Sequence, residues 1–237
     1  MRSSIRTLSL ITCCVLIAGC SSAFRLFSPS LKLSSTVVDY DGSGVYGVEV
    51  KVIDGVEREV GADTTDANGG FRIELTNYNK EGKYELIVAK DLIVEAHREP
   101  LDLASGGNPV PPQIEVSVLG AVRGLIQNTV ETPVVAANVA ILTEDGEEYD
   151  NTDTRSGGVF GLGYLEPGEY KLRIFDPRYL PSESPYFEIG KGEIKDVGSL
   201  LIERVPLGGI SAIDLKKENK WTTISITPKT EGRLQER

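Results

Sequence analysis

Residues 65–71 (TDANGGF) and 154–160 (TRSGGVF) decide the fold of this chain, because they are two copies of one turn-and-strand signal. Both read Thr-x-x-x-Gly-x-Phe. Gly and Asn in the middle supply the positive φ that a tight turn requires. In the first copy, residues 71–75 (FRIEL) then alternate apolar and charged side chains, which is the period of a strand with one buried face. Each copy therefore predicts a tight turn that leads into a half-buried strand.

The likeness between the two copies extends on both sides of this signal. Upstream, residues 47–52 (GVEVKV) and 136–141 (AANVAI) each alternate as a strand does. Downstream, residues 82–88 (GKYELIV) and 168–174 (GEYKLRI) share Gly-x-Tyr-x-Leu. The offset is 89 residues at the turn and 86 at the tyrosine, so the copies differ by a short loop. A repeat of this length indicates one structural unit present twice.

The strand signals predict an all-β protein made of two tandem β-sandwiches. Each unit has room for about seven short strands in roughly 85 residues, a spacing typical of a sandwich of two antiparallel sheets. We place the first sandwich at residues 31–119 and the second at 120–205. The last strand of the first, 114–118, runs almost directly into the opening of the second, so we expect a stiff, elongated pair.

These residues resemble a known family, the carboxypeptidase regulatory-like (transthyretin-like) domain. The resemblance rests on Gly47-Val48, on the Thr-x-x-x-Gly-x-Phe turn and on Gly-x-Tyr-x-Leu in each copy. It implies a seven-stranded Greek-key sandwich of the transthyretin type. It also implies a module that serves as a spacer, an adhesion unit or a part of an assembly. The copies depart from the family pattern at Arg155, where the first copy has Asp66, and over residues 92–103.

The N-terminus has the layout of an export signal. Arg2 and Arg6 precede a short apolar stretch, residues 8–18, which is too short to span a bilayer as a helix. Residues 17–20 (IAGC) resemble the lipobox of bacterial lipoproteins. That resemblance implies a signal peptide over 1–19, cleavage before Cys20, a lipid on its sulfur and a tether over 20–30. The family's sorting rule, with Ser21 after the cysteine, implies the outer membrane. The alternative is an ordinary signal peptide with a chance cysteine.

Composition excludes several classes of function. The three cysteines are Cys13, Cys14 and Cys20, so the body of the chain has no thiol for a disulfide, for a metal or for nucleophilic catalysis. The formal net charge of −10 argues against binding nucleic acid or lying flat on anionic lipid. No phosphate loop or hydrolase motif is present, so we predict no enzyme, catalytic residue, cofactor or metal site. His97, the single histidine, has no partner acid that would suggest catalysis.

Three acidic or aromatic features each have a functional and a structural interpretation. Asp63, Asp66 and Asn68 carry oxygen ligands suited to calcium, but their spacing favours a plain Asx-rich turn. The acidic stretch 144–150 could bind cations, and a solvated hairpin or loop is the favoured interpretation. Tyr179 and Tyr186 could contact a sugar, although tyrosines at sandwich corners are more often structural.

The C-terminal segment, residues 206–237, departs from the repeat. We predict a β-hairpin with strands at 210–215 and 221–227 around residues 216–220 (KKENK). The segment is the one net-basic stretch of the mature chain and contains Trp221, the sole tryptophan. It is either an interaction hairpin, since aromatic and basic residues serve at interfaces, or a cover for the edge of the second sandwich. The cover is slightly favoured.

Together these features favour a structural or interaction protein. We expect an outer-membrane lipoprotein, held to the membrane by lipid on Cys20, whose tandem sandwiches hold or space an envelope protein partner. The alternative is a surface lipoprotein that binds a glycan or another small ligand through its sandwich loops.

Overall fold

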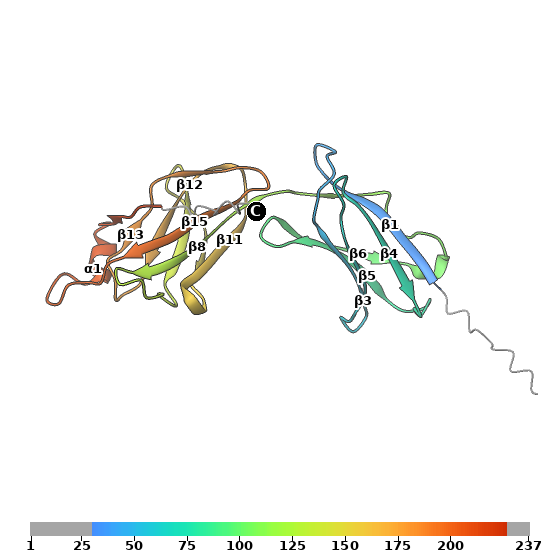
Figure 1. The fold of residues 1–237 in the computed structure, drawn as a ribbon, viewed down its shortest axis with the longest axis horizontal. Helices are drawn as coiled ribbons and strands as arrows, with labels where there is room; N and C mark the ends of the chain where they lie inside the picture. Colours follow the sequence, from blue (N-terminus) through green and yellow to red (C-terminus); the bar gives the residue numbers. More distant parts are fainter. Residues whose placement is uncertain (1–29, 227–237) are drawn as a thin grey trace, which may run out of the picture.

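The computed structural model describes residues 30–226, and over these residues the protein is predominantly β, as predicted (Figure 1). The N-terminal half consists of strands β1 (Ser30–Asp39), β2 (Glu49–Asp54), β3 (Glu59–Thr64), β4 (Gly70–Thr76), β5 (Tyr84–Lys90), β6 (Val94–Leu101) and β7 (Gln113–Val116), with a 3₁₀ turn η1 (Leu103–Ser105).

The C-terminal half repeats this order and adds a further segment. It consists of β8 (Gly120–Asn128), β9 (Asn138–Thr143), β10 (Glu148–Asp153), the 3₁₀ turn η2 (Ser156–Gly158), β11 (Val159–Leu165), β12 (Gly168–Phe175), β13 (Ser182–Glu183), β14 (Phe187–Ile189), β15 (Ile194–Ile202), the helix α1 (Ala212–Lys217) and β16 (Thr222–Thr223).

Each half has two sheets, and the smaller sheet has the same topology in both halves. In the N-terminal half, the sheet β4-β1-β7 faces the sheet β3-β2-β5-β6. In the C-terminal half, the sheet β11-β8-β15 faces β10-β9-β12-β13-β16, with β14 also paired to β12. The central strands β1 and β8 each pair antiparallel on one side and parallel on the other. The halves lie end to end along the long axis of the molecule (Figure 1).

Each half has its own hydrophobic core between its two sheets, and the strand alternation predicted which side chains enter it. Phe71, Ile73 and Leu75 on β4 are all buried in the core of the N-terminal half. On β12, the core-facing positions are Tyr170, Leu172 and Ile174, which are buried in the core of the C-terminal half. Each core is therefore formed by side chains of its own half.

The repeated threonine ties a loop to a strand end in the same way in both halves. Thr65 and Thr154 are 1% and 3% exposed. The Thr65 hydroxyl donates to the carbonyl oxygen of Val45 at 2.6 Å and accepts from the backbone N–H of Val48 at 2.9 Å. The Thr154 hydroxyl makes the matching bonds to Val134 and Ala137 at 2.7 and 2.9 Å. The threonine is repeated because one hydroxyl satisfies two buried backbone groups.

The repeated glycine adopts the left-handed conformation that the turn requires. Gly69 has φ +80° and Gly158 has φ +75°. A Cβ on Gly158 would lie 2.5 Å from the carbonyl oxygen of Ile126, so both conformation and space require glycine there. Before Gly69, the Asp66 side chain accepts hydrogen bonds from two backbone N–H groups, at Asn68 and Gly70. This is the geometry of the Asx-rich turn that the sequence favoured.

The departures from the family pattern change loops and leave the strand order intact. Arg155 makes no side-chain capping bond, and the turn there becomes the 3₁₀ segment η2. Residues 92–103, which the family pattern did not place, contain β6, which pairs antiparallel with β5. Ahead of β6, Leu92 has a left-handed backbone with φ +62°.

The predicted C-terminal hairpin is wrong over the part that the structure describes. Residues 212–217 form helix α1, and the two-residue strand β16 pairs in parallel with β13 of the preceding sheet. The Ser211 hydroxyl caps the helix by accepting from the N–H of Asp214 at 3.2 Å. Asp214 in the first turn and Lys216 and Lys217 in the last turn also favour the helix. These local signals outweigh the short alternation that suggested a strand.

Candidate interaction surface at the C-terminal segment

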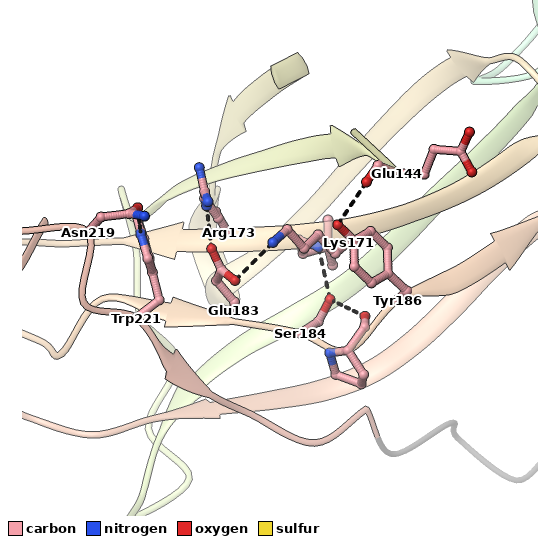
Figure 2. Close-up of polar contacts among 10 residues, drawn as sticks. Glu144, Lys171, Arg173, Glu183, Ser184, Tyr186, Asn219 and Trp221 are labelled. Carbon is pink, nitrogen blue, oxygen red and sulfur yellow. Dashed lines mark hydrogen bonds and ion pairs between the residues drawn. The ribbon is translucent and has the colours of Figure 1, made fainter. Parts of the chain in front are cut away.

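Side chains from β12 and β13 form a charged cluster on the outer side of the larger sheet of the C-terminal half (Figure 2). Lys171 and Arg173 alternate along β12 with core residues, so both lie on this outer side. Glu183 on β13 is the register partner of Arg173. Its carboxylate accepts a hydrogen bond from the Arg173 Nε and another, at 3.1 Å, from the Lys171 Nζ.

The cluster is partly removed from water, and its charges match. The side chains of Lys171 and Glu183 are 15% and 19% exposed. Burial alone would raise the pKa of the Glu183 carboxyl, but the hydrogen bonds from Arg173 and Lys171 outweigh it and bring the pKa below its usual range. Glu183 therefore stays ionised and holds both cations in fixed positions.

Aromatic rings from the following segments pack against these cations. The Arg173 guanidinium lies 4.8 Å from the centre of the Trp221 ring, and the Lys171 Nζ lies 5.2 Å from that of Tyr186. The rings are oriented by further bonds: the Trp221 Nε1 donates to the Asn219 side chain at 2.9 Å, and the Tyr186 hydroxyl donates to the carbonyl oxygen of Glu144 at 3.2 Å (Figure 2). One face of each ring is thus occupied by a cation from the sheet.

Main-chain bonds and two buried side chains complete the attachment of residues 206–226, the part of the C-terminal segment that the structure describes. The N–H of Thr222 donates to the Pro181 carbonyl at 2.7 Å, and the N–H of Ile224 to that of Glu183 at 2.8 Å. Ala212 is buried, and Ile224 joins the core of the C-terminal half. The segment covers the edge of this sheet, as the favoured interpretation predicted.

The attached segment presents three apolar side chains to solvent, which we call the apolar tip. Leu207, Ile210 and Ile213 are 105%, 54% and 48% exposed. Helix α1, which contains Ile213, lies at the end of the molecule opposite to the start of β1 (Figure 1). Because exposed apolar patches mark interaction sites, these three side chains are a candidate contact surface.

Lysines accompany the apolar tip. Lys216 and Lys217 lie in the last turn of α1, and the Lys216 Nζ lies 4.3 Å from the centre of the Phe175 ring. Lys220 pairs with Glu218 at 2.7 Å. The alternation that suggested a strand concealed this surface. The signal that could have found it is Ser211 followed three residues later by Asp214 and then by lysines, which together mark a short capped helix.

Of the other residues singled out in the sequence, Tyr186 is 42% exposed and belongs to the charged cluster. Tyr179 is buried. His97 lies on β6, with its Nε2 3.6 Å from the Glu99 carboxylate. The acidic stretch 144–150 is the turn of the β9–β10 hairpin and the start of β10. Cys20, the predicted lipidation site, lies outside the described residues.

Within residues 30–226, no helix is long and apolar enough to cross a membrane. In the same residues, no group of three or more His, Cys, Asp or Glu side chains is arranged to hold a metal ion.

Comparison with protein families finds a carboxypeptidase regulatory-like domain at residues 121–200. The matched range lies within the second predicted copy, 120–205, and confirms the resemblance there. The first copy lies outside the match, so its family assignment stays a prediction based on the shared motifs. No curated protein matches the chain.

Among solved structures, the chain is similar to the Bacillus anthracis TIE protein, with 19% identity and a TM-score of 0.34 over 73% of this chain; it spans only 34% of that protein. It is also similar to a double mutant of shaft pilin SpaA from Lactobacillus rhamnosus GG, with 11% identity and a TM-score of 0.37 over 76% of this chain and 98% of the pilin. It is similar as well to GBS52, the minor pilin in the gram-positive pathogen Streptococcus agalactiae, with 15% identity and a TM-score of 0.33 over 75% of this chain and 98% of that pilin. Similarity at these values does not bear on function.

Proposed function

We propose that this protein is a lipid-anchored structural module of a bacterial outer membrane, which holds a partner protein of the envelope at the end far from its anchor. The lipobox-like residues 17–20 and the export signal before them support anchoring through Cys20. Two or more acyl chains on one cysteine give stable attachment without a membrane-spanning helix. The protein acts without catalysis: it sets the distance and orientation between the membrane and the partner.

The apolar tip is the observation that carries this proposal. Exposure of aliphatic side chains to water is unfavourable. A partner that covers them would gain a binding free energy of roughly 25 cal/mol per Å² of apolar surface buried. The attachment through Trp221, Arg173 and β16 holds the tip in one position, which lowers the entropy lost on binding.

The charges beside the tip define the chemistry of the partner. Within residues 206–226, Lys216, Lys217 and Lys220 outnumber Asp214 and Glu218, in a chain whose net charge is −10. A partner that meets this end best has an apolar groove with an acidic rim. The same partner would be repelled by the acidic remainder of the molecule, which favours binding at the tip.

Site-specific photo-crosslinking in intact cells tests the partner proposal. A photoreactive amino acid replaces Leu207 or, as a control, Val56, which is 78% exposed in the N-terminal half. We expect one adduct of defined mass from position 207 and none from position 56. The adduct should be lost when Ile213→Asp is introduced alongside, because a charge at the tip opposes apolar contact. Equal adducts at both positions, no adduct, or an adduct unaffected by Ile213→Asp would refute the proposal.

Metabolic labelling with a fatty acid tests the anchor separately. Cys20→Ser should abolish incorporation of the label and release the protein from the membrane fraction, whereas Cys14→Ser should change neither. Incorporation that survives Cys20→Ser would refute anchoring through this residue.

The glycan alternative receives less support from the cluster of aromatic residues. Sugars stack on free ring faces, but Trp221 and Tyr186 each have a face covered by a cation of the same sheet. Titration of envelope polysaccharides against Trp221 fluorescence separates the two functions. A saturable change in Trp221 fluorescence would favour the glycan alternative.

A further inference from the structure

A backbone hydrogen bond between the β5–β6 turn and strand β11 joins the two halves of the molecule. The N–H of Tyr164 donates a hydrogen bond to the carbonyl oxygen of Leu92 at 2.9 Å. Beside it, Leu92 lies directly over Gly163: a Cβ on this glycine would come within 2.6 Å of the Leu92 Cα and carbonyl oxygen. A side chain at position 163 is therefore incompatible with the contact.

Both residues that make this hydrogen bond have an unusual backbone. Leu92 has φ +62° and Tyr164 has φ +59°, in the left-handed region that non-glycine residues rarely adopt. The pairing of β11 with β8 shifts register between Leu162 and Leu165, so a bulge turns the Tyr164 N–H away from its own sheet. Strained conformations persist where surrounding contacts impose them, and here they meet across the boundary between the halves.

A second set of contacts joins the halves through charge. The Lys191 ammonium, in the loop between β14 and β15, pairs with the carboxylates of Asp39 and Asp41 in the N-terminal half, at 3.0 Å for Asp41. Asp39 is buried, so this ion pair is partly shielded from water. In the chain between the halves, Leu119 donates to the carbonyl of Ile93 at 2.9 Å and accepts from the N–H of Gly192 at 3.2 Å.

The site on β11 that receives Leu92, formed by residues 161–164, we call the socket. The repeat shows that it exists in one copy only. At the offset of 89 residues, Gly161 and Gly163 correspond to Arg72 and Glu74 on β4, which are exposed. Strand β4 pairs with β1 without a register shift, so it has no bulge to free an N–H. The N-terminal half therefore cannot receive a turn as β11 does.

The turn that fills the socket also exists in one copy only. At the offset of 86 residues, Leu92 corresponds to Arg178. The Arg178 guanidinium pairs with Asp176 of its own half at 2.6 Å and donates to the carbonyl of Val135 at 3.1 Å. Where the N-terminal half has Leu92, the C-terminal half therefore has Arg178, whose charge is paired within its own half.

We infer that Leu92 and the Gly161–Tyr164 bulge form a dedicated joint, reinforced by Lys191, that fixes the orientation of the two halves and cannot be repeated between molecules. One chain contains one inserting turn and one socket, and each is used within the chain. The socket is therefore occupied by the Leu92 turn of its own molecule. This inference does not depend on the anchor or on the apolar tip.

Pulsed electron–electron spin resonance on the full chain tests the joint. Spin labels are placed by Val56→Cys and Val130→Cys, at positions 78% and 76% exposed in different halves, after serine replaces Cys13, Cys14 and Cys20. We expect one narrow distance distribution for the parent chain. Gly163→Ala should widen it at least twofold, because the added Cβ displaces Leu92.

Gly107→Ala is the matched control. A Cβ at Gly107 meets nothing within 4 Å, and its backbone is not left-handed, so this variant should keep the narrow distribution. Lys191→Ala provides a second test that leaves the glycine intact, and it should also widen the distribution. Circular dichroism confirms that each variant is folded. A broad distribution in the parent chain, or a narrow one in folded Gly163→Ala and Lys191→Ala, would overturn the inference.

Discussion

Replacing the repeated threonine by valine should destabilise whichever half contains it, by a similar amount in both halves. Thr65→Val keeps the shape of the side chain and removes the hydroxyl that bonds Val45 and Val48. One buried carbonyl and one buried N–H lose this partner, at about 1–3 kcal/mol each. The buried methyl group returns about 0.8 kcal/mol. Two lost partners, less the gain from the methyl group, give an expected net loss of roughly 1–5 kcal/mol in the free energy of unfolding.

The loss is large enough to read from thermal and chemical denaturation. For a unit of this size, 1 kcal/mol lowers the Tm by about 4–8 °C, so a loss of about 3 kcal/mol should lower the Tm of the affected half by roughly 12–24 °C. Trp221 lies in the C-terminal half and reports its unfolding by fluorescence, while circular dichroism reports both halves. Thr154→Val should therefore move the fluorescence midpoint, and Thr65→Val should move only the transition seen by circular dichroism.

The adjacent Thr64→Val is the control for the same chemical change, because Thr64 is exposed. It should alter stability by less than about 0.5 kcal/mol, as surface substitutions usually do. If Thr65→Val were as mild as Thr64→Val, the hydroxyl would not be satisfying the two backbone groups. A Thr65→Val effect many times larger than that of Thr154→Val would contradict the structural equivalence of the copies.

Three further predictions address the attachment of the C-terminal segment, the joint and the tyrosine of the repeat. Trp221→Leu removes the cation–π contact with Arg173, worth about 0.5–2 kcal/mol, and should speed tryptic cleavage within residues 216–220 severalfold; an unchanged cleavage rate would contradict the contact. The backbone N–H of Ser43 and then Lys191 lower the pKa of Asp41 from 3.8 to about 2, so its stabilising contribution is full above pH 4 and is lost as the pH falls toward 2. Asp41→Asn should abolish that part of the acid dependence in a pH series of unfolding midpoints, and an identical pH profile would refute it. Tyr170→Phe deletes the 2.7 Å hydrogen bond to the Glu166 carbonyl and should cost about 0.5–1.5 kcal/mol in denaturant unfolding.

The main strands and the cores could be predicted from the sequence because their signals are local and occur twice. The glycine at positions 69 and 158 is required by a positive φ, and the alternation from Phe71 to Leu75 assigns one face to the core. Two copies of each signal separate a real turn from a chance one. The match to residues 121–200 agrees with this reasoning for the second copy.

The cap at Ser211 marks helix α1 locally, but the attachment of residues 206–226 to the sheet could not be predicted in the same way, because it depends on contacts between residues far apart in sequence. A stretch of six residues such as 210–215 fits a strand period and a helical period about equally well. The parallel pairing of β16 with β13 and the packing of Trp221 on Arg173 involve residues 40 and 48 positions apart in sequence. Neither contact leaves a local pattern in the segment itself.

One part of the joint is visible in the sequence, but the sequence alone does not show which segment it contacts. Two glycines in a strand, at positions 161 and 163, weaken it and indicate a bulge or a close approach of another backbone. What approaches is Leu92, about 70 residues earlier, in the region that the family pattern left unplaced.

The single joint has a consequence for engineering the length of the molecule. Many tandem modules can be lengthened by inserting another copy, because each copy carries both halves of the contact with its neighbours. Here, if the N-terminal half were duplicated, the second copy would present Arg72 and Glu74 to the Leu92 turn of the first copy in place of the socket. If the C-terminal half were duplicated, the first copy would present Arg178 to the socket of the second copy in place of Leu92. Either insertion would create a hinge. A longer straight rod would require the Gly-x-Gly bulge and the leucine turn to be transplanted together with the added copy.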